Sequence, residues 1–203
     1  FLTERTNKVL PWGTLVGIRP SKKALELLNE GYSEEEIIKD FKERHVTSKE
    51  KSKLCIEVAK YERNIVNENE NVISVYVGMP FCPTRCLYCS FTSNPIGGCK
   101  NIVKPYLKAL SQEIKTLSKY IEAKGLIIES VYFGGGTPTA VSEDEFEEIM
   151  KDIYENLVAE KNIKEFTVEC GRPDSITEYK LNSMKRYKVQ RISINPQTMN
   201  DST

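Results

Sequence analysis

The sequence predicts an α/β fold in which a parallel sheet follows a small all-helical region. Apolar runs suited to strands alternate with amphipathic helical stretches from residue 72 to residue 195. Residues 20–64, by contrast, show helical periodicity alone. Strict alternation of strands with crossover helices is typical of a parallel sheet, which is either covered on both faces or closed into a barrel.

Three short helices are expected in residues 20–64. Two pairs have the spacing of a capping box, in which Ser or Thr is followed three residues later by Glu: Ser33 with Glu36, and Thr47 with Glu50. Gly31 would end the first helix. The apolar stripe expected on the third helix consists of Leu54, Cys55 and Val58.

The polar stretch 64–71 marks the expected domain boundary, because it is rich in Asn and Glu and has no periodicity to bury. We therefore expect a helical region at 1–68 and an α/β core at 69–203. Four strands alone would leave an unpaired sheet edge. Because the chain also begins at Phe1 rather than Met, we expect a fragment whose core continues beyond Thr203.

The α/β part divides into four strands and three helices. The expected strands are 72–77, 126–133, 164–169 and 191–195, and the expected helices are 103–121, 142–157 and 175–186. The connection 78–100 is much longer than the roughly 2–6 residues usual between a strand and its helix. Its prolines and glycines keep the backbone irregular, so that it can wrap a compact ligand.

Composition restricts the partners and the compartment. Lys plus Arg equals Asp plus Glu at 29 each, so no overall basic charge argues for a nucleic-acid partner. No apolar run approaches the roughly 18–20 residues of a membrane span, and no signal sequence opens the chain. Half of the six cysteines are clustered, which suits a reducing compartment better than a disulfide framework. We expect a cytoplasmic protein without a membrane partner.

Three cysteines, Cys82, Cys86 and Cys89, lie within eight residues of each other just after the first strand. Thiolate sulfur selects iron–sulfur clusters, zinc or Cu(I), and a four-iron cluster with three protein ligands keeps one iron open. Structural zinc is the alternative, but it requires four ligands, for which only Cys99 and the remote His45 are available. A disulfide would leave one of the three thiols unpaired.

Further polar or glycine-rich positions follow the other strands. Gly134 to Thr139 form a glycine-rich turn that lacks the Lys-Ser/Thr ending of a phosphate-binding loop, so alone it could be only a tight turn. Glu169 ends the third strand and Gln197 follows the fourth. A solvated carboxylate is the ordinary interpretation of Glu169, and packing is that of Tyr76 in the first strand.

These residues together match a known family. The run Cys82-x-x-x-Cys86-x-Tyr88-Cys89 resembles the radical S-adenosylmethionine signature. The wider chain resembles the oxygen-independent coproporphyrinogen III oxidase/dehydrogenase family, in particular its HemZ-like branch. The matching segments are Val16 to Pro20, Pro80 to Ser93, Gly171 to Asp174 and Arg191 to Met199.

The resemblance implies a fold and two cofactors. The fold would be the N-terminal part of a partial parallel βα barrel of radical-SAM type. Cys82, Cys86 and Cys89 would bind a 4Fe-4S cluster whose fourth iron binds S-adenosylmethionine, the source of a deoxyadenosyl radical. The residues implied in S-adenosylmethionine binding are Tyr76, Tyr88, Gly135, Gly136, Thr137, Glu169 and Gln197; four of them, Tyr88, Gly136, Thr137 and Gln197, match positions that contact a second such molecule in oxidases of this type.

The resemblance also implies an activity: oxygen-independent oxidative decarboxylation of coproporphyrinogen III to protoporphyrinogen IX in haem biosynthesis. The partners would be the porphyrinogen and an electron donor such as flavodoxin or ferredoxin. Gly78 and Phe91 replace a His and a Cys of the best-known branch, and Tyr88 to Phe91 also resembles the haem-chaperone branch. A haem-binding protein, or a radical enzyme with another substrate, is therefore the alternative. Cys170 is assigned to packing, and Arg172 and Arg191 to surface ion pairs rather than substrate binding.

Overall fold

The computed structural model describes residues 5–15, 19–65 and 69–200. The chain divides into two compact units, Phe1–Glu68 and Asn69–Thr203. Residues 16–18 of the first matching segment lie outside the described residues. None of the helices in the described ranges is long and apolar enough to cross a membrane.

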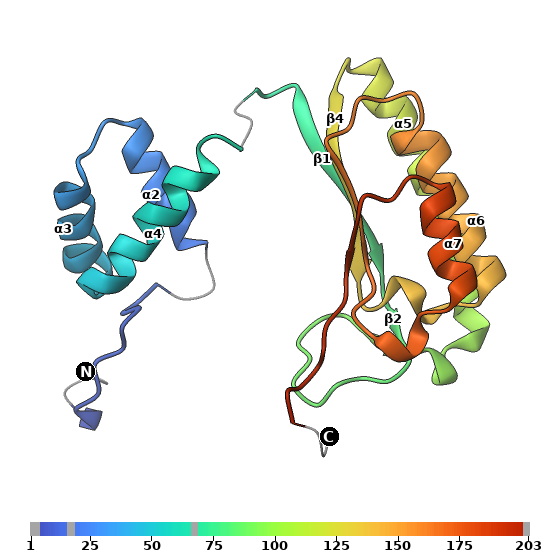
Figure 1. Ribbon diagram of the computed structural model, residues 1–203, viewed down its shortest axis with the longest axis horizontal. Helices are drawn as coiled ribbons and strands as arrows, with labels where there is room; N and C mark the ends of the chain where they lie inside the picture. Colours follow the sequence, from blue (N-terminus) through green and yellow to red (C-terminus); the bar gives the residue numbers. More distant parts are fainter. Residues whose placement is uncertain (1–4, 16–18, 66–68, 201–203) are drawn as a thin grey trace. The chain divides into compact units, whose positions relative to one another are not determined.

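The described residues of the first unit include the helices α2 (Pro20–Asn29), α3 (Glu34–His45) and α4 (Lys49–Glu62) (Figure 1). Gly31 follows α2 with a φ of 92°, as expected for a residue that ends a helix. Ser33 and Glu36 form the predicted capping box at the start of α3. The core of this unit consists of Leu15, Ala24, Leu25, Ile37, Phe41, Cys55, Ile56 and Ala59.

Two expectations for α4 were wrong. The helix is capped by Ser48, whose side chain accepts a hydrogen bond from Lys51 N–H, because Thr47 is buried and donates its hydroxyl to the carbonyl of Trp12. Leu54 is 42% exposed and Val58 is 38% exposed. The helix is rotated so that it buries Ser52, Cys55, Ile56 and Ala59.

The second unit is built on a four-stranded sheet in the order β1-β4-β5-β6. Its strands are β1 (Val72–Met79), β4 (Ile127–Gly135), β5 (Glu165–Glu169) and β6 (Arg191–Ser193). Every neighbouring pair is parallel, which confirms the predicted parallel α/β arrangement. Three helices lie on one face of the sheet (Figure 1): α5 (Lys100–Ala123), α6 (Glu143–Ile153) and α7 (Glu178–Arg186).

Alternation along the strands separates the two faces of the sheet. The helix-facing side chains are buried and apolar: Val75, Val77, Met79, Ile128, Val131, Phe133, Phe166 and Val168. On the opposite face of β1 and β4, Ser74 pairs with Ser130 and Tyr76 with Tyr132. Polar and aromatic groups therefore occupy the face that would be the interior of a barrel.

Several boundaries differ from the expected ones. The helix expected at 175–186 begins only at Glu178, because Pro173–Ser175 form a 3-10 turn and Thr177 caps the helix. Helix α6 passes at Tyr154 into a π-helical turn. The long connection after β1 contains two short parallel strands, β2 (Phe81–Cys82) and β3 (Asn94–Pro95), so it is more ordered than an irregular loop.

Candidate functional site

The glycine-rich turn is attached to the start of the cysteine loop at the carboxyl ends of the strands. Met79 and Gly135, the last residues of β1 and β4, are partners in the parallel ladder. Just beyond them, Gly136 N–H donates to the Met79 carbonyl at 2.6 Å and Thr137 N–H donates to the Phe81 carbonyl at 2.8 Å. The start of the cysteine loop and the glycine-rich turn, whose bonded residues are more than 50 positions apart in sequence, are thus joined by backbone hydrogen bonds into one layer.

Glu169 closes this layer from the side of β5. Its Oε2 atom accepts a hydrogen bond from Gly135 N–H at 3.1 Å. Gly135 has a φ of 108°, which L side chains rarely adopt, and an added Cβ would lie 2.8 Å from the Met79 carbonyl oxygen. At Gly134, a Cβ would lie 2.6 Å from Glu169 Oε2. Glycine is therefore required here so that the carboxylate and two backbones can approach each other.

Cys82 is held against the same turn. It is buried at the end of β2, and Thr137 Oγ1 donates a hydrogen bond to its sulfur at 3.3 Å. A Cβ on Gly136 would lie 3.0 Å from Cys82 Sγ and 2.7 Å from the Phe81 carbonyl oxygen. The first cysteine of the motif thus has a fixed place beside the glycine turn.

Cys86 and Cys89 lie on the more exposed part of the loop. Cys89 N–H donates to the Cys86 carbonyl at 3.1 Å, which forms a turn. The side chain of Ser93, followed by the backbone of Phe91, lowers the pKa of the Cys89 thiol because each stabilises the thiolate. Within residues 5–15, 19–65 and 69–200, no three His, Cys, Asp or Glu side chains are gathered around one metal position. Cys86 and Cys89 must therefore turn for three sulfurs to share a centre.

Tyr88 and Gln197 are brought together across 109 residues. Tyr88 Oη donates to Gln197 Oε1 at 3.0 Å, and Gln197 Nε2 donates to the Gly171 carbonyl. Gln197 adopts a φ of 65°, which is uncommon outside glycine and marks a constrained position. The cysteine loop is therefore connected to the segment that follows β6.

A cavity of about 520 Å³ lies beside this layer. It brings together three of the predicted residues, Tyr76, Gly135 and Glu169. The rings of Tyr76 and Tyr132 stack at 5.9 Å with an interplanar angle of 11°. Burial, followed by the charge of Glu169, raises the pKa of both tyrosines, so both are neutral phenols at neutral pH.

Tyr132, Tyr106 and Phe91 also line the cavity and were missed from the sequence. Tyr106, in α5, donates its hydroxyl to the carbonyl of Gly78 at 2.6 Å. Tyr132 could have been found by counting from the strand ends, because it precedes Gly134 by two residues, as Tyr76 precedes Gly78. Tyr106 carried no such pattern, since an aromatic residue on an amphipathic helix ordinarily indicates packing.

Arg172 and Lys180 were also missed as parts of the site. Arg172 pairs with Asp174, as expected for a surface ion pair, but its Nη1 atom also donates to Thr84 Oγ1 at 2.9 Å. Lys180 is only 5% exposed, although lysine is rarely buried. Its Nζ atom donates to the carbonyls of Thr139 at 2.6 Å and of Ser175 at 3.1 Å.

The remaining candidates have ordinary structural roles. Cys170 is fully buried, and burial raises its pKa to about 11, which leaves a neutral core thiol. Cys99 packs against the core at the start of α5. Arg191 forms an ion pair with Glu165 at 2.7 Å.

The site residues fit an iron–sulfur cluster and a small organic cofactor. Six cysteines are free thiols, and three of them lie in the loop that the glycine turn supports. The close approaches at Gly134, Gly135 and Gly136 leave no room for side chains, so glycine allows this turn to pack tightly against the start of the cysteine loop and Glu169. Glu169 supplies a carboxylate acceptor at the edge of the cavity.

The fold and this site define a class of protein. Residues 76–203 match the family model described as the Radical SAM superfamily, and the chain belongs to that superfamily. Membership implies a 4Fe-4S cluster and S-adenosylmethionine as cofactors.

The names of individual relatives refer to coproporphyrinogen or haem. The chain is 36% identical over 206 residues to an oxygen-independent coproporphyrinogen-III oxidase-like protein, HemZ, of Bacillus subtilis, covering 100% of this chain and 41% of that protein. It is 36% identical over 129 residues to the haem chaperone HemW of the same organism, covering 63% of this chain and 32% of that one. The chain thus spans less than half of these curated relatives.

A solved structure supports the fold. Coproporphyrinogen III oxidase (HemN) from Escherichia coli, described as a radical SAM enzyme, matches 71% of this chain with a TM-score of 0.51 and 24% identity, and the match covers 32% of that structure. The likeness confirms the predicted fold class, a parallel α/β core of radical-SAM type preceded by a helical region.

Proposed function

We propose that this chain is the cofactor-binding part of a radical S-adenosylmethionine enzyme. Cys82, Cys86 and Cys89 would hold the 4Fe-4S cluster. The observation that carries the proposal is the meeting of Cys82, the glycine turn and Glu169 in one hydrogen-bonded layer. When bound, the cluster and S-adenosylmethionine supply a carbon-centred radical that abstracts hydrogen from an unreactive carbon.

The chain's own residues would bind and orient the organic cofactor. Glu169 and the backbone of Gly135 and Gly136 would contact its polar end, since the glycines allow close approach. The stacked ring of Tyr76 offers an aromatic surface within the cavity. Thr137 would fix the cluster side, where it already donates to Cys82.

Tyr88 and Gln197 would act as a pair. Their hydrogen bond holds the cysteine loop against the segment after β6. A cofactor molecule, whether the first or a second one, that contacts one of these two side chains would therefore contact the other as well. Their mutual contact favours a shared role over two independent ones.

For the whole protein we propose oxygen-independent oxidative decarboxylation of coproporphyrinogen III to protoporphyrinogen IX in haem biosynthesis. Similarity to HemZ over the full chain and to HemN in fold supports this assignment. Haem binding without oxidation is the second candidate, which the similarity to HemW favours. The protein would act in the cytoplasm, where six free thiols remain reduced.

The electron donor would be an acidic redox protein such as flavodoxin or ferredoxin. Residues 71–112, which comprise β1, the cysteine loop and the first half of α5, contain no Asp or Glu. Four basic residues of this stretch are exposed: Arg85, Lys100, Lys104 and Lys108. The positive charge of this stretch would attract a negatively charged partner.

Anaerobic reconstitution tests the proposal. The wild-type chain should bind about four iron and four sulfide ions, and Cys86→Ala should abolish this cluster. Cys99→Ala is the matched control and should retain it, because Cys99 packs against the core. Binding of zinc alone, or loss of the cluster in Cys99→Ala, would contradict the proposed ligand set.

Substrate assays on the full-length protein separate the two candidate functions. With reductant and S-adenosylmethionine, an oxidase should convert coproporphyrinogen III to protoporphyrinogen and release deoxyadenosine. Stable haem binding with transfer to an apoprotein, but no porphyrinogen turnover, would instead establish the chaperone.

A further inference from the structure

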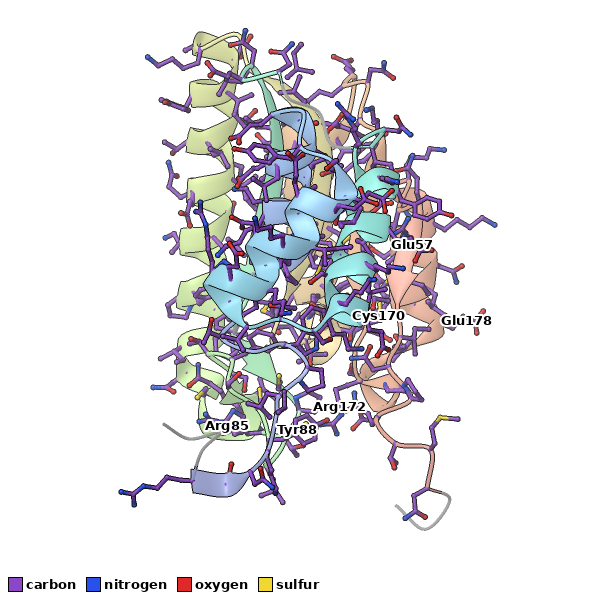
Figure 2. All side chains as sticks on the ribbon, turned by 90° about the vertical axis from the view of Figure 1, so that its left-hand side faces the viewer. Glu57, Arg85, Tyr88, Cys170, Arg172 and Glu178 are labelled. Atoms are coloured by element: carbon purple, nitrogen blue, oxygen red, sulfur yellow. The ribbon has the colours of Figure 1, made fainter. Side chains whose placement is uncertain are left out.

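Arg172 connects the cysteine loop to the end of β5. Its guanidinium uses three nitrogens: Nε and Nη2 donate to the two carboxylate oxygens of Asp174 at 3.1 and 2.8 Å, and Nη1 donates to Thr84 Oγ1 at 2.9 Å. Thr84 lies between Cys82 and Cys86 and is 88 residues away in sequence. Figure 2 shows Arg172 at the same end of the second unit as Arg85 and Tyr88 of that loop.

The backbone of Arg172 is fixed in turn. Its carbonyl accepts hydrogen bonds from Ser175 N–H at 3.0 Å and from Ser175 Oγ at 2.7 Å. Ser175 Oγ also lies 2.6 Å from Thr139 Oγ1 in the glycine-rich segment, and Lys180 donates to the carbonyls of both residues. The cysteine loop, the turn after β5 and the glycine-rich segment are therefore joined in one network.

The geometry requires arginine. A planar guanidinium can serve a bidentate carboxylate and a third acceptor at once, whereas an ammonium group has no fixed fork. The ion pair with Asp174 alone would contribute little, because Asp174 is 57% exposed. The contact with Thr84 matters more, since it restrains the segment between Cys82 and Cys86, whereas the bonds of Thr137 and Gln197 hold Cys82 and Tyr88.

We infer that Arg172 is a positioning residue, which holds the cysteine loop in place at Thr84 before any cluster binds. Anchoring the backbone between the first two cysteines lowers the ordering cost of binding, because part of the loop is already restrained before Cys86 and Cys89 join Cys82. The restraint on the loop is independent of the cofactor, while its effect on cluster binding rests on the proposed function.

Limited trypsin digestion of the iron-free full chain measures the restraint directly. Arg85 is exposed on the loop, so the bond between Arg85 and Cys86 reports loop opening, and cleavage after the exposed Arg63 serves as the internal reference. Arg172→Met should accelerate cleavage after Arg85 about tenfold, since one charge-assisted hydrogen bond is lost. Trypsin does not cut at residue 172 itself because Pro173 follows.

Three further variants make the test specific. Thr84→Val should reproduce the effect, and the double variant should be no faster than either single one, as expected for a shared contact. Arg172→Lys should rescue only part of the protection. Arg186→Met is the matched control, because Arg186 pairs with Glu147 elsewhere in this unit, and it should leave cleavage after Arg85 unchanged.

A second measurement concerns the cluster. After anaerobic reconstitution, Arg172→Met should contain less iron and sulfide than wild type or Arg186→Met, and its reduced cluster should have an altered electron paramagnetic resonance spectrum. Unchanged digestion in Arg172→Met would overturn the inference. Accelerated digestion together with a wild-type chain that binds no cluster would uphold the restraint and overturn the proposed function instead.

Discussion

The choice of residue is most restricted in the glycine-rich turn, where the glycines pack directly against backbone atoms of other segments. The cavity edge at Gly135 needs a left-handed φ, while Gly136 needs empty space next to Cys82 and two carbonyl oxygens. The sequence identified this turn as glycine-rich, but three glycines in a row do not reveal which neighbours they approach. Those neighbours belong to β1, β2 and β5, so their identity depends on how the strands are stacked.

Gly136→Ala should destabilise the second unit by about 1–3 kcal/mol, the range for forcing a group into a filled space. The added Cβ would lie 2.7 Å from the Phe81 carbonyl and 2.9 Å from the Met79 carbonyl, and backbone atoms cannot rotate away. Urea unfolding of the iron-free chain provides the measurement. Gly97→Ala is the control, because no atom lies within 4 Å of its Cβ position; equal effects of the two substitutions would contradict the explanation.

Among the elements, sequence patterns located every main strand and helix of the sheet unit but not all of their ends. Capping chemistry explains the differences. At α4, Ser48 rather than Thr47 caps the helix because Thr47 is buried against Trp12. At α7, a 3-10 turn and the cap at Thr177 delay the helix. At α4 both Thr47 and Ser48 are suitable cap residues, and packing chooses between them.

The link between the glycine-rich segment and α7 depends on Lys180. Lys180→Met should lower the free energy of unfolding by about 1–3 kcal/mol, because the buried carbonyls of Thr139 and Ser175 lose a donor. Thermal or urea unfolding measures the loss. Lys185→Met, on the exposed side of the same helix, should change stability by no more than about 0.5 kcal/mol. An unchanged free energy of unfolding in Lys180→Met would contradict this prediction and would show that water takes the place of the amine as donor.

At the scale of the whole molecule, the phenol of Tyr187 makes the stability of the fold depend on pH in alkaline solution. Burial, followed by a hydrogen bond to Glu147, raises the pKa of Tyr187 above the ordinary tyrosine value to about 12. The folded chain thus holds this proton more tightly than the unfolded chain. The resulting stability is fully present below about pH 10 and is lost as pH rises towards about 12.

Tyr187→Phe should therefore be less stable than wild type below pH 10, and the difference should shrink between about pH 10 and 12. Denaturant unfolding across this range checks the expectation. Tyr179→Phe, at an exposed tyrosine of α7, provides the control for general alkaline effects. A gap at Tyr187 that stays constant with pH would refute the linkage.

The sequence by itself determined the alternation of strands and helices, the clustering of three cysteines in one loop and the strand-end positions of Glu169 and the glycine turn. These follow from local periodicity and residue type. Only the tertiary structure decided that Tyr88 meets Gln197, that Tyr132 stacks on Tyr76, and that Arg172 holds Thr84. These contacts join segments as many as 109 residues apart, and their geometry is set by strand register and loop packing.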